Sequence, residues 1–300
     1  MEKTTQTVPA EAIEAYSQFI HGEIDRRSFL NRVNKVAVSS VAAAAMVEQL
    51  MPNYAAGQQV SPTDARLKTE YATVPSPSGH GTIKGYLVRP ASAGNNKLPS
   101  ILVVHENRGL NPHIEDIARR FALAGFMAFA PDALTSMGGY PGDEEKAGAM
   151  FGKLDRPKMM EDLHASAVWL RARPDSTGRL GATGFCFGGG VANTLAVRMG
   201  ADLKAAAPFY GGAPPAADVP KIKAAILVHH GGEDKRLVDA WPEFDAAMKA
   251  AGVVHEGHIY PGAVHGFNND ATPMRYNKAA ADEAWTLTIA WFNKYVKATS

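Results

Sequence analysis

The stretch Gly184-Phe185-Cys186-Phe187-Gly188-Gly189-Gly190 decides how the rest of the chain is interpreted. Residues 179–183 precede it, follow a turn at 176–178 and predict a short buried strand. Apolar residues at helical spacing follow from Val191, and Gly200 ends that predicted helix. Glycines two positions before and after Cys186 permit a sharp strand-to-helix turn that holds one side chain out over the end of a sheet. The alternative is a buried structural cysteine beside a glycine-rich packing corner.

The composition excludes several classes of function. The 300 residues are 46% hydrophobic and 20% charged, as in soluble globular proteins, and the net charge of +1 gives no reason to expect a nucleic acid or an anionic membrane as partner. The single cysteine excludes an intrachain disulfide and a zinc site built on several thiolates. We interpret His229, His230, His255 and His258 as strand-end or surface residues, and expect neither a metal nor a cofactor.

Residues 1–60 differ from the rest of the chain. A short helix is predicted over 9–20, and Asp25 caps a second one. The sequence Arg26-Arg27-Ser28-Phe29-Leu30 resembles a twin-arginine export signal, and the small residues 54–57 offer a cleavage site. The weakly apolar run that follows the arginines is too short to span a bilayer.

Two interpretations of this segment stay open. In one, it is a signal that directs the protein to the periplasm. In the other, the protein is cytoplasmic, and the uncleaved helical arm packs on the catalytic domain or on a second subunit of a homodimer.

Residues 62–300 are predicted to form one α/β domain. Strands are expected at 67–74, 82–88, 99–104, 126–130, 179–183, 205–210, 224–228 and 253–260. Helical patterns separate most of these strands, one of them around 244–251. Strands that alternate with helices indicate a mostly parallel sheet with helices on both faces, preceded here by the N-terminal helical segment.

Three polar residues follow three strands of this predicted sheet. Cys186 comes first, Asp234 follows the strand at 224–228, and His265 follows the last strand. Nucleophile, acid and histidine is the chain order of the α/β-hydrolase triad. His265 would take the thiol proton, and Asp234 would hold the histidine tautomer. Alone, each residue is more often structural; together, in this order, they predict a catalytic site.

The loop after the strand at 99–104 carries further candidates. The backbone N–H groups of Asn107 and Phe187 stand where this architecture places its oxyanion hole. Glu106 would lie beside the sulfur and accept the thiol proton or a hydrogen bond in the resting state; the alternative is a surface glutamate. The glycine-rich residues 138–152 predict a lid or pocket wall, with Tyr140 as a candidate substrate contact.

The chain resembles the dienelactone hydrolase (carboxymethylenebutenolidase) family over nearly all of residues 65–298. The matching stretches are His105-Glu106-Asn107-Arg108-Gly109-Leu110-Asn111, Gly184-Phe185-Cys186-Phe187-Gly188-Gly189, Gly231-Gly232-Glu233-Asp234 and His265-Gly266-Phe267. The resemblance implies an α/β-hydrolase fold and a triad of Cys186, His265 and Asp234. It also implies that Glu106 engages the resting cysteine, and that a small ester or lactone is hydrolysed without a cofactor.

The sequence departs from this family at the groups that bind substrate. The family's founding members hold a substrate carboxylate with two arginines, and Asn269 stands at one of these positions. Lys146 is the only cation in the stretch that matches the other. Arg108 and Arg236 are candidate substitutes, so Arg108, Tyr140, Arg236 and Asn269 are the predicted substrate contacts. A non-catalytic protein that keeps Cys186 as a redox-sensing thiol is the alternative function.

Overall fold

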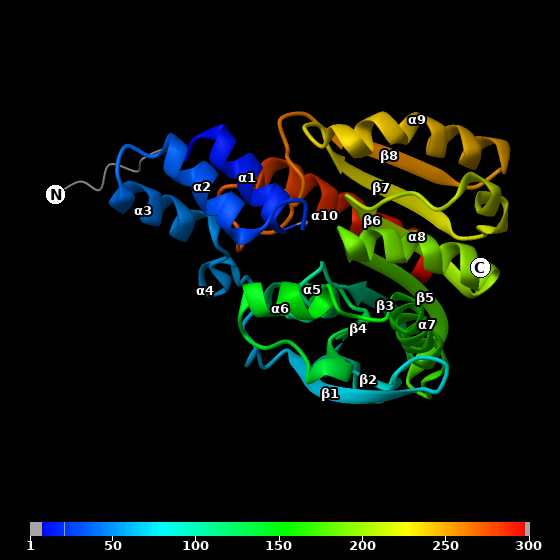
Figure 1. Ribbon diagram of the computed structural model, residues 1–300. Coiled ribbons are helices and arrows are strands. Elements are labelled where there is room, and N and C mark those ends of the chain that lie inside the picture. The colour runs from blue at the N-terminus through cyan, green and yellow to red at the C-terminus, as the bar shows by residue number, and fades with distance from the viewer. Residues whose placement is uncertain (1–7, 21, 298–300) are drawn as a thin grey trace.

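The chain folds around a twisted sheet with helices on both faces (Figure 1). The computed structural model describes residues 8–20 and 22–297. The sheet has eight strands in the order β1-β2-β4-β3-β5-β6-β7-β8. Their bounds are β1 Leu67–Ser76, β2 Gly81–Pro90, β3 Leu98–Val104, β4 Met127–Pro131, β5 Ser176–Phe185, β6 Leu203–Phe209, β7 Ala225–Gly231 and β8 His255–Tyr260. The β1–β2 and β2–β4 pairs are antiparallel and all others are parallel, which confirms the predicted α/β-hydrolase fold.

The helices of the domain divide between the two faces of the sheet. Their bounds are α5 Pro112–Leu123, α6 Glu144–Phe151, α7 Arg156–Ala172, α8 Phe187–Met199, α9 Lys235–Ala250 and α10 Lys278–Phe292. In β3, Leu102 and Val104 pack with α7 and α8, whereas Ile101 and Val103 pack with α5 and α10. Because successive strand residues point to opposite faces, a continuous apolar run such as β3 serves two cores.

The N-terminal helices form a small subdomain against one side of the sheet domain (Figure 1). They are α1 Ala10–Ile20, α2 Arg26–Val36, α3 Ser40–Leu50 and α4 Tyr54–Gly57, together called the N-terminal arm below. Tyr16, Phe29, Val33 and Leu50 lie in a core of their own inside this arm. Within residues 8–20 and 22–297, we find no helix with both the length and the apolar character needed to cross a membrane.

Two sequence predictions need correction in detail. His229 and His230 lie at the end of β7, within its last three residues, but they are not surface residues, because the strand is covered on both faces. The ring nitrogens of His229 lie 2.9 Å from the Tyr260 hydroxyl and 3.0 Å from the Thr288 hydroxyl, so its burial leaves no polar atom unsatisfied. Helix α9 begins at Lys235, well before residue 244, since Pro242 within it masks the helical pattern.

Candidate active site

Cys186 occupies a strained turn between β5 and α8. Its backbone has φ 55° and ψ −112°, a conformation that residues other than glycine rarely adopt. The Cys186 N–H donates to the Phe209 carbonyl at 3.1 Å, and the Cys186 carbonyl accepts from the N–H groups of Gly189 and Gly190 at 3.1 and 3.2 Å. These bonds tie the turn to β6 and to the first turn of α8, so the surrounding structure maintains the strain.

The glycines around Cys186 are required by close backbone contacts. A Cβ on Gly184 would lie 2.2 Å from the Gly188 carbonyl oxygen, and one on Gly188 would lie 2.3 Å from that of Val104. A Cβ on Gly189 would lie 2.5 Å from the Phe209 oxygen. No real Cβ comes so close to backbone atoms, so strand, turn and helix pack as they do only with glycine at these positions.

His265 and Asp234 form a buried pair next to Cys186. The His265 Nδ1 atom lies 2.5 Å from Asp234 Oδ2. Burial opposes a charge on His265, but the charges of Cys186 and Asp234 and hydrogen bonding to both raise its pKa to about 9. Burial alone would raise the pKa of Asp234, but the hydrogen bond and the charge of His265 outweigh this effect, and the pKa of Asp234 is lowered. The structure therefore brings together the three residues that the sequence placed after three strands, which are β5, β7 and β8.

Glu106 lies in the loop after β3, among groups that the sequence did not connect with it. Asn269 Nδ2 donates to Glu106 Oε2 at 3.3 Å. Burial, and then the charge of Glu106, hold the pKa of the Tyr210 hydroxyl well above its ordinary value. The Tyr210 ring centroid lies 4.9 Å from that of His265, and its backbone has φ 38°. Tyr210 was missed in the sequence, although it directly follows a strand and precedes two glycines, as a site residue would.

A cleft of about 440 Å³ opens above Cys186. Asn107 and Phe187, the two predicted oxyanion-hole residues, both line it. Arg156 also lines the cleft, and its guanidinium lies over the rings of Phe151 and Phe187, at 4.4 and 5.8 Å from their centroids. Arg156 was not a sequence candidate, because only packing brings the start of α7 to the mouth of this cleft.

The comparison with known proteins identifies the family. The profile of the "Dienelactone hydrolase family" matches residues 83–296. The chain belongs to the dienelactone hydrolase family. An Escherichia coli (strain K12) protein named "Putative carboxymethylenebutenolidase" is 32% identical over 234 residues, which cover 73% of this chain and 85% of that protein. "Putative hydrolase fragment YghX" of the same strain is 53% identical over 113 residues, 38% of this chain and 96% of its own length.

A solved relative has the same fold. The crystal structure of a protein named "Putative Dienelactone Hydrolase" from Klebsiella pneumoniae superposes with a TM-score of 0.67 at 29% identity, covering 76% of this chain and 99% of its own. As a member of the dienelactone hydrolase family, the protein is an ester or lactone hydrolase with a small-molecule substrate.

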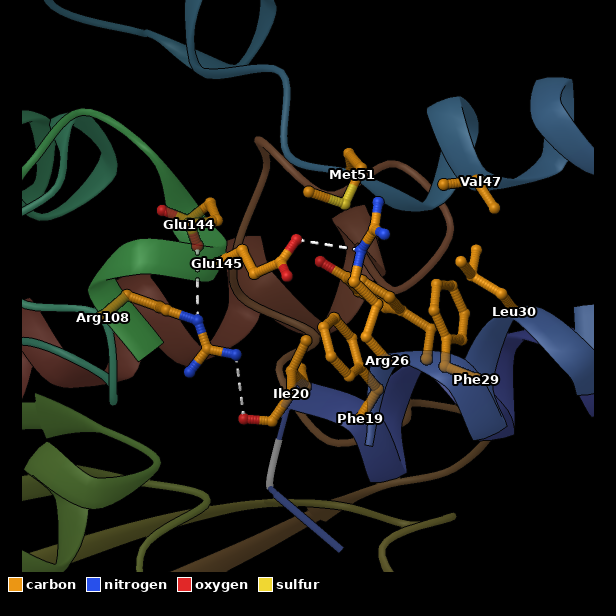
Figure 2. Close-up of a pocket in the computed structure, with 11 residues that line it drawn as sticks. Phe19, Ile20, Arg26, Phe29, Leu30, Val47, Met51, Arg108, Glu144 and Glu145 are labelled. Carbon is orange, nitrogen blue, oxygen red and sulfur yellow. Dashed lines mark hydrogen bonds and ion pairs between the residues drawn. The ribbon is translucent and has the colours of Figure 1, made fainter. Parts of the chain in front are cut away.

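In this hydrolase, the four predicted substrate contacts lie in different places. Arg236 lines the cleft above Cys186. The Tyr140 hydroxyl donates to Glu144 Oε1 at 2.9 Å, and Asn269 is buried against Glu106. Arg108 lines a second cavity, of about 250 Å³, beneath the N-terminal arm (Figure 2). Of these four, only Arg236 thus shares a cavity with Cys186.

Proposed function

We propose that the protein hydrolyses small carboxylic esters or lactones through a Cys186–His265–Asp234 triad and a covalent acyl-enzyme. The observation that carries the proposal is the hydrogen-bonded Asp234–His265 pair, whose histidine responds to the charge of Cys186. The strained position of Cys186 at the N-terminus of α8 adds support, since unpaired N–H groups and the helix dipole favour a thiolate there. Family membership supports the same reaction class.

The chemistry divides into two half-reactions. A pKa of about 9 keeps His265 protonated at neutral pH, so that it balances a Cys186 thiolate. The thiolate adds to the substrate carbonyl, and the backbone N–H groups of Asn107 and Phe187 bind the resulting oxyanion. His265 then gives its proton to the departing alkoxide, which leaves a thioester on Cys186. In the second half, neutral His265 takes a proton from water as the water attacks the thioester, and the acid and the thiolate are regenerated.

Glu106 takes part in the resting state of this scheme. Before substrate binds, Cys186 is a thiol that donates a hydrogen bond to the Glu106 carboxylate; when a substrate displaces Glu106, the thiol proton passes to His265 and the thiolate–imidazolium pair forms. Asn269 then acts on Glu106 and not on the substrate, because its amide donates to Glu106 Oε2 at 3.3 Å. We therefore assign Asn269 to the support of Glu106.

The sulfur restricts the leaving group. A thiolate is itself a good leaving group, so a tetrahedral intermediate with a poor one, such as an amine, expels sulfur and returns to substrate. The leaving groups of aryl esters, enol esters and strained lactones depart readily enough to compete with the thiolate. We expect plain amides to be resistant.

Turnover of p-nitrophenyl acetate by Cys186→Ala tests the proposal. The variant should fold and lose a factor of roughly 10³ or more in kcat, the scale seen when such a unit is broken. The matched pair His265→Gln and His258→Gln separates the triad from other histidines, because His258 lies on β8 outside the cleft and its variant should stay within about twofold of wild type. Retention of more than about a tenth of wild-type kcat by Cys186→Ala would contradict the assignment of Cys186 as the nucleophile. Absence of ester turnover in wild type, together with reversible oxidation of Cys186, would favour the alternative function, a redox-sensing thiol.

A further inference from the structure

The N-terminal arm reaches the loop that carries the proposed oxyanion hole. Asn107 Nδ2 donates to the Ile20 carbonyl at 2.7 Å, and Arg108 Nη2 donates to the same oxygen at 3.1 Å. Figure 2 shows Arg108 between this carbonyl and Glu144 of α6. Ile20 is the last residue of α1, so its carbonyl has no partner within the helix and lies at the negative end of the helix dipole. An amide N–H₂ group and a guanidinium are therefore suitable partners for it.

The arm also contacts the wall of the cleft. The Tyr54 hydroxyl donates to Glu144 Oε1 at 2.6 Å, and Arg26 pairs with Glu145 at 3.0 Å. Both glutamates begin α6, the helix that ends at Phe151 in the cleft. Arg26 belongs to the Arg-Arg pair of the predicted export signal, and here it joins the arm to the domain.

A third set of contacts joins the arm to the loop that follows His265. The Asn53 N–H donates to the Ala271 carbonyl at 2.6 Å. The guanidinium of Arg275 lies 5.5 Å from the centroid of the Tyr16 ring. Arg275 is buried, and a Cβ on Gly266, the residue next to His265, would lie 2.8 Å from its Nη1 atom. The arm thus touches each of the three segments that carry Asn107, Phe151 and His265.

The arm is rigid enough to position these segments. Val33 and Ala15 are fully buried within it, and Tyr16 and Phe29 are nearly so. The rings of Phe19 and Phe29 stack with their centroids 5.1 Å apart. A helical unit with its own core can hold the Ile20 carbonyl at one place.

We propose that the N-terminal arm is a permanent part of the enzyme and that the Ile20 carbonyl positions the Asn107 N–H for the developing oxyanion. This inference rests on the proposed function, because it assigns that N–H to the oxyanion hole. Ile20 and the Asn107 side chain are positioning groups, and the backbone N–H is the group that touches the reacting atoms. Cleavage near residues 56–58, which an export signal would require, would remove the whole arm and this contact with it.

Asn107→Ala tests the positioning role, since it keeps the backbone N–H and removes the shorter of the two hydrogen bonds to the Ile20 carbonyl, the other coming from Arg108. We expect kcat for p-nitrophenyl acetate to fall about tenfold with KM within twofold, because a misplaced donor weakens transition-state binding more than substrate binding. Arg26→Ala is the matched control. It cuts an exposed arm-to-domain ion pair, leaves the Ile20 contact in place, and should keep kcat within about twofold.

Amide hydrogen exchange at residues 10–20 separates positioning from a direct substrate contact of the Asn107 side chain. Exchange there should rise in Asn107→Ala together with the loss of kcat. Faster exchange with unchanged kcat would show that the arm does not serve catalysis, and lower kcat with unchanged exchange would assign the Asn107 side chain to substrate. Either result overturns the proposal. If the triad assignment itself were wrong, Cys186→Ala would retain ester turnover, and this result is distinguishable from both of those outcomes.

The mass of the protein recovered from its native host tests the permanence of the arm. We expect a chain that retains residues 8–57. A chain that begins near residue 58 would overturn this part of the proposal, whatever the kinetics of Asn107→Ala.

Discussion

Arg156 is the side chain most suited to attract an acidic substrate. Its guanidinium lies over the rings of Phe151 and Phe187 at the cleft. Burial lowers the pKa of Arg156, but the ordinary pKa of arginine is so high that the side chain remains charged. A carboxylate that enters the cleft would meet this cation, or the exposed Arg236. Asn269, at the position where the family's founding members have an arginine, is instead buried against Glu106.

Arg156→Met should therefore lower kcat/KM for a carboxylated aryl ester about ten- to a hundredfold and change that for its neutral analogue less than about threefold. The selective loss should shrink at high salt, since salt screens the attraction. Arg198→Met is the control, because Arg198 lies on α8 and pairs with Glu161 away from the cleft. Equal losses for both esters would indicate that Arg156 shapes the cleft without binding charge.

The residues of the site differ in how visible they are in the sequence. Cys186, Asp234 and His265 each follow a strand, and parallel strands end at one edge of a sheet, so their meeting could be predicted. Arg156 carries no such signal, and Tyr210, although it also follows a strand, was counted as part of the strand predicted at 205–210. Arg156 is brought there by the packing of α7, and Tyr210 is recognisable only once its backbone strain and its contact with His265 are seen.

At the scale of elements, the turn from β5 into α8 depends on glycines for different reasons. A Cβ on Gly184 would collide with the backbone of Gly188 at 2.2 Å, and neither segment can move without breaking the sheet or the helix. A Cβ on Gly190 would find its nearest backbone atoms at 3.7 Å, in ordinary contact. The two glycines look alike in the sequence, but the structure has room for a Cβ only at Gly190.

Gly184→Ala should therefore lower the free energy of unfolding by several kcal/mol or prevent folding, as overpacking against fixed backbone does. Gly190→Ala should be neutral or stabilise by up to about 1 kcal/mol, since alanine is the better helix former inside α8. Urea unfolding followed by circular dichroism measures both. Equal stability of the two variants would mean that the turn relaxes more easily than its contacts indicate.

The sequence predicted the beginnings of elements best where a side chain caps a helix. Asp25 accepts a hydrogen bond from the backbone N–H of Ser28, as predicted, and Asn111 caps α5 in the same way by accepting from the N–H of Ile114. Strand ends were less predictable. β5 begins at Ser176, before the expected 179, and β7 extends past the expected 228 to include His229 and His230. The length of a buried strand depends on which neighbouring elements pack over it, and the local sequence pattern does not show this.

At the scale of the whole molecule, a buried charge network joins the end of the arm to the domain. Asp116 of α5 accepts from the Val60 N–H at 2.8 Å and pairs with Arg119 and Arg120. Arg120 also pairs with Asp270 in the loop after His265. The segment after α4 is thus attached to α5 and, through Arg120, to the loop after His265, which the arm also contacts. Such a connection across distant parts of the chain could not be predicted from the sequence, since none of these residues belongs to a recognisable motif.

Buried histidines give the molecule a stability that depends on pH in both directions. Burial lowers the pKa of His230 to about 4, whereas the ordinary value is near 6.5. Below pH 6.5 the unfolded chain therefore binds a proton that the folded protein refuses until about pH 4, so stability falls as the pH falls through this window. His265 acts in the opposite sense. Its folded pKa of about 9 means that its contribution is fully present below pH 6.5 and is lost as the pH rises toward 9.

We expect the free energy of unfolding to be greatest near pH 6.5 and to decline on both sides, by at most about 1.4 kcal/mol per pH unit for each such group. Urea unfolding between pH 4.5 and 9.5 measures this profile. His230→Gln should flatten the acid side alone and His265→Gln the alkaline side alone, so each variant serves as the control for the other. Because His229 is also buried with its pKa well below the ordinary value, some acid slope should remain in His230→Gln. An acid side as steep in His230→Gln as in wild type would show that His230 takes up its proton in the folded protein.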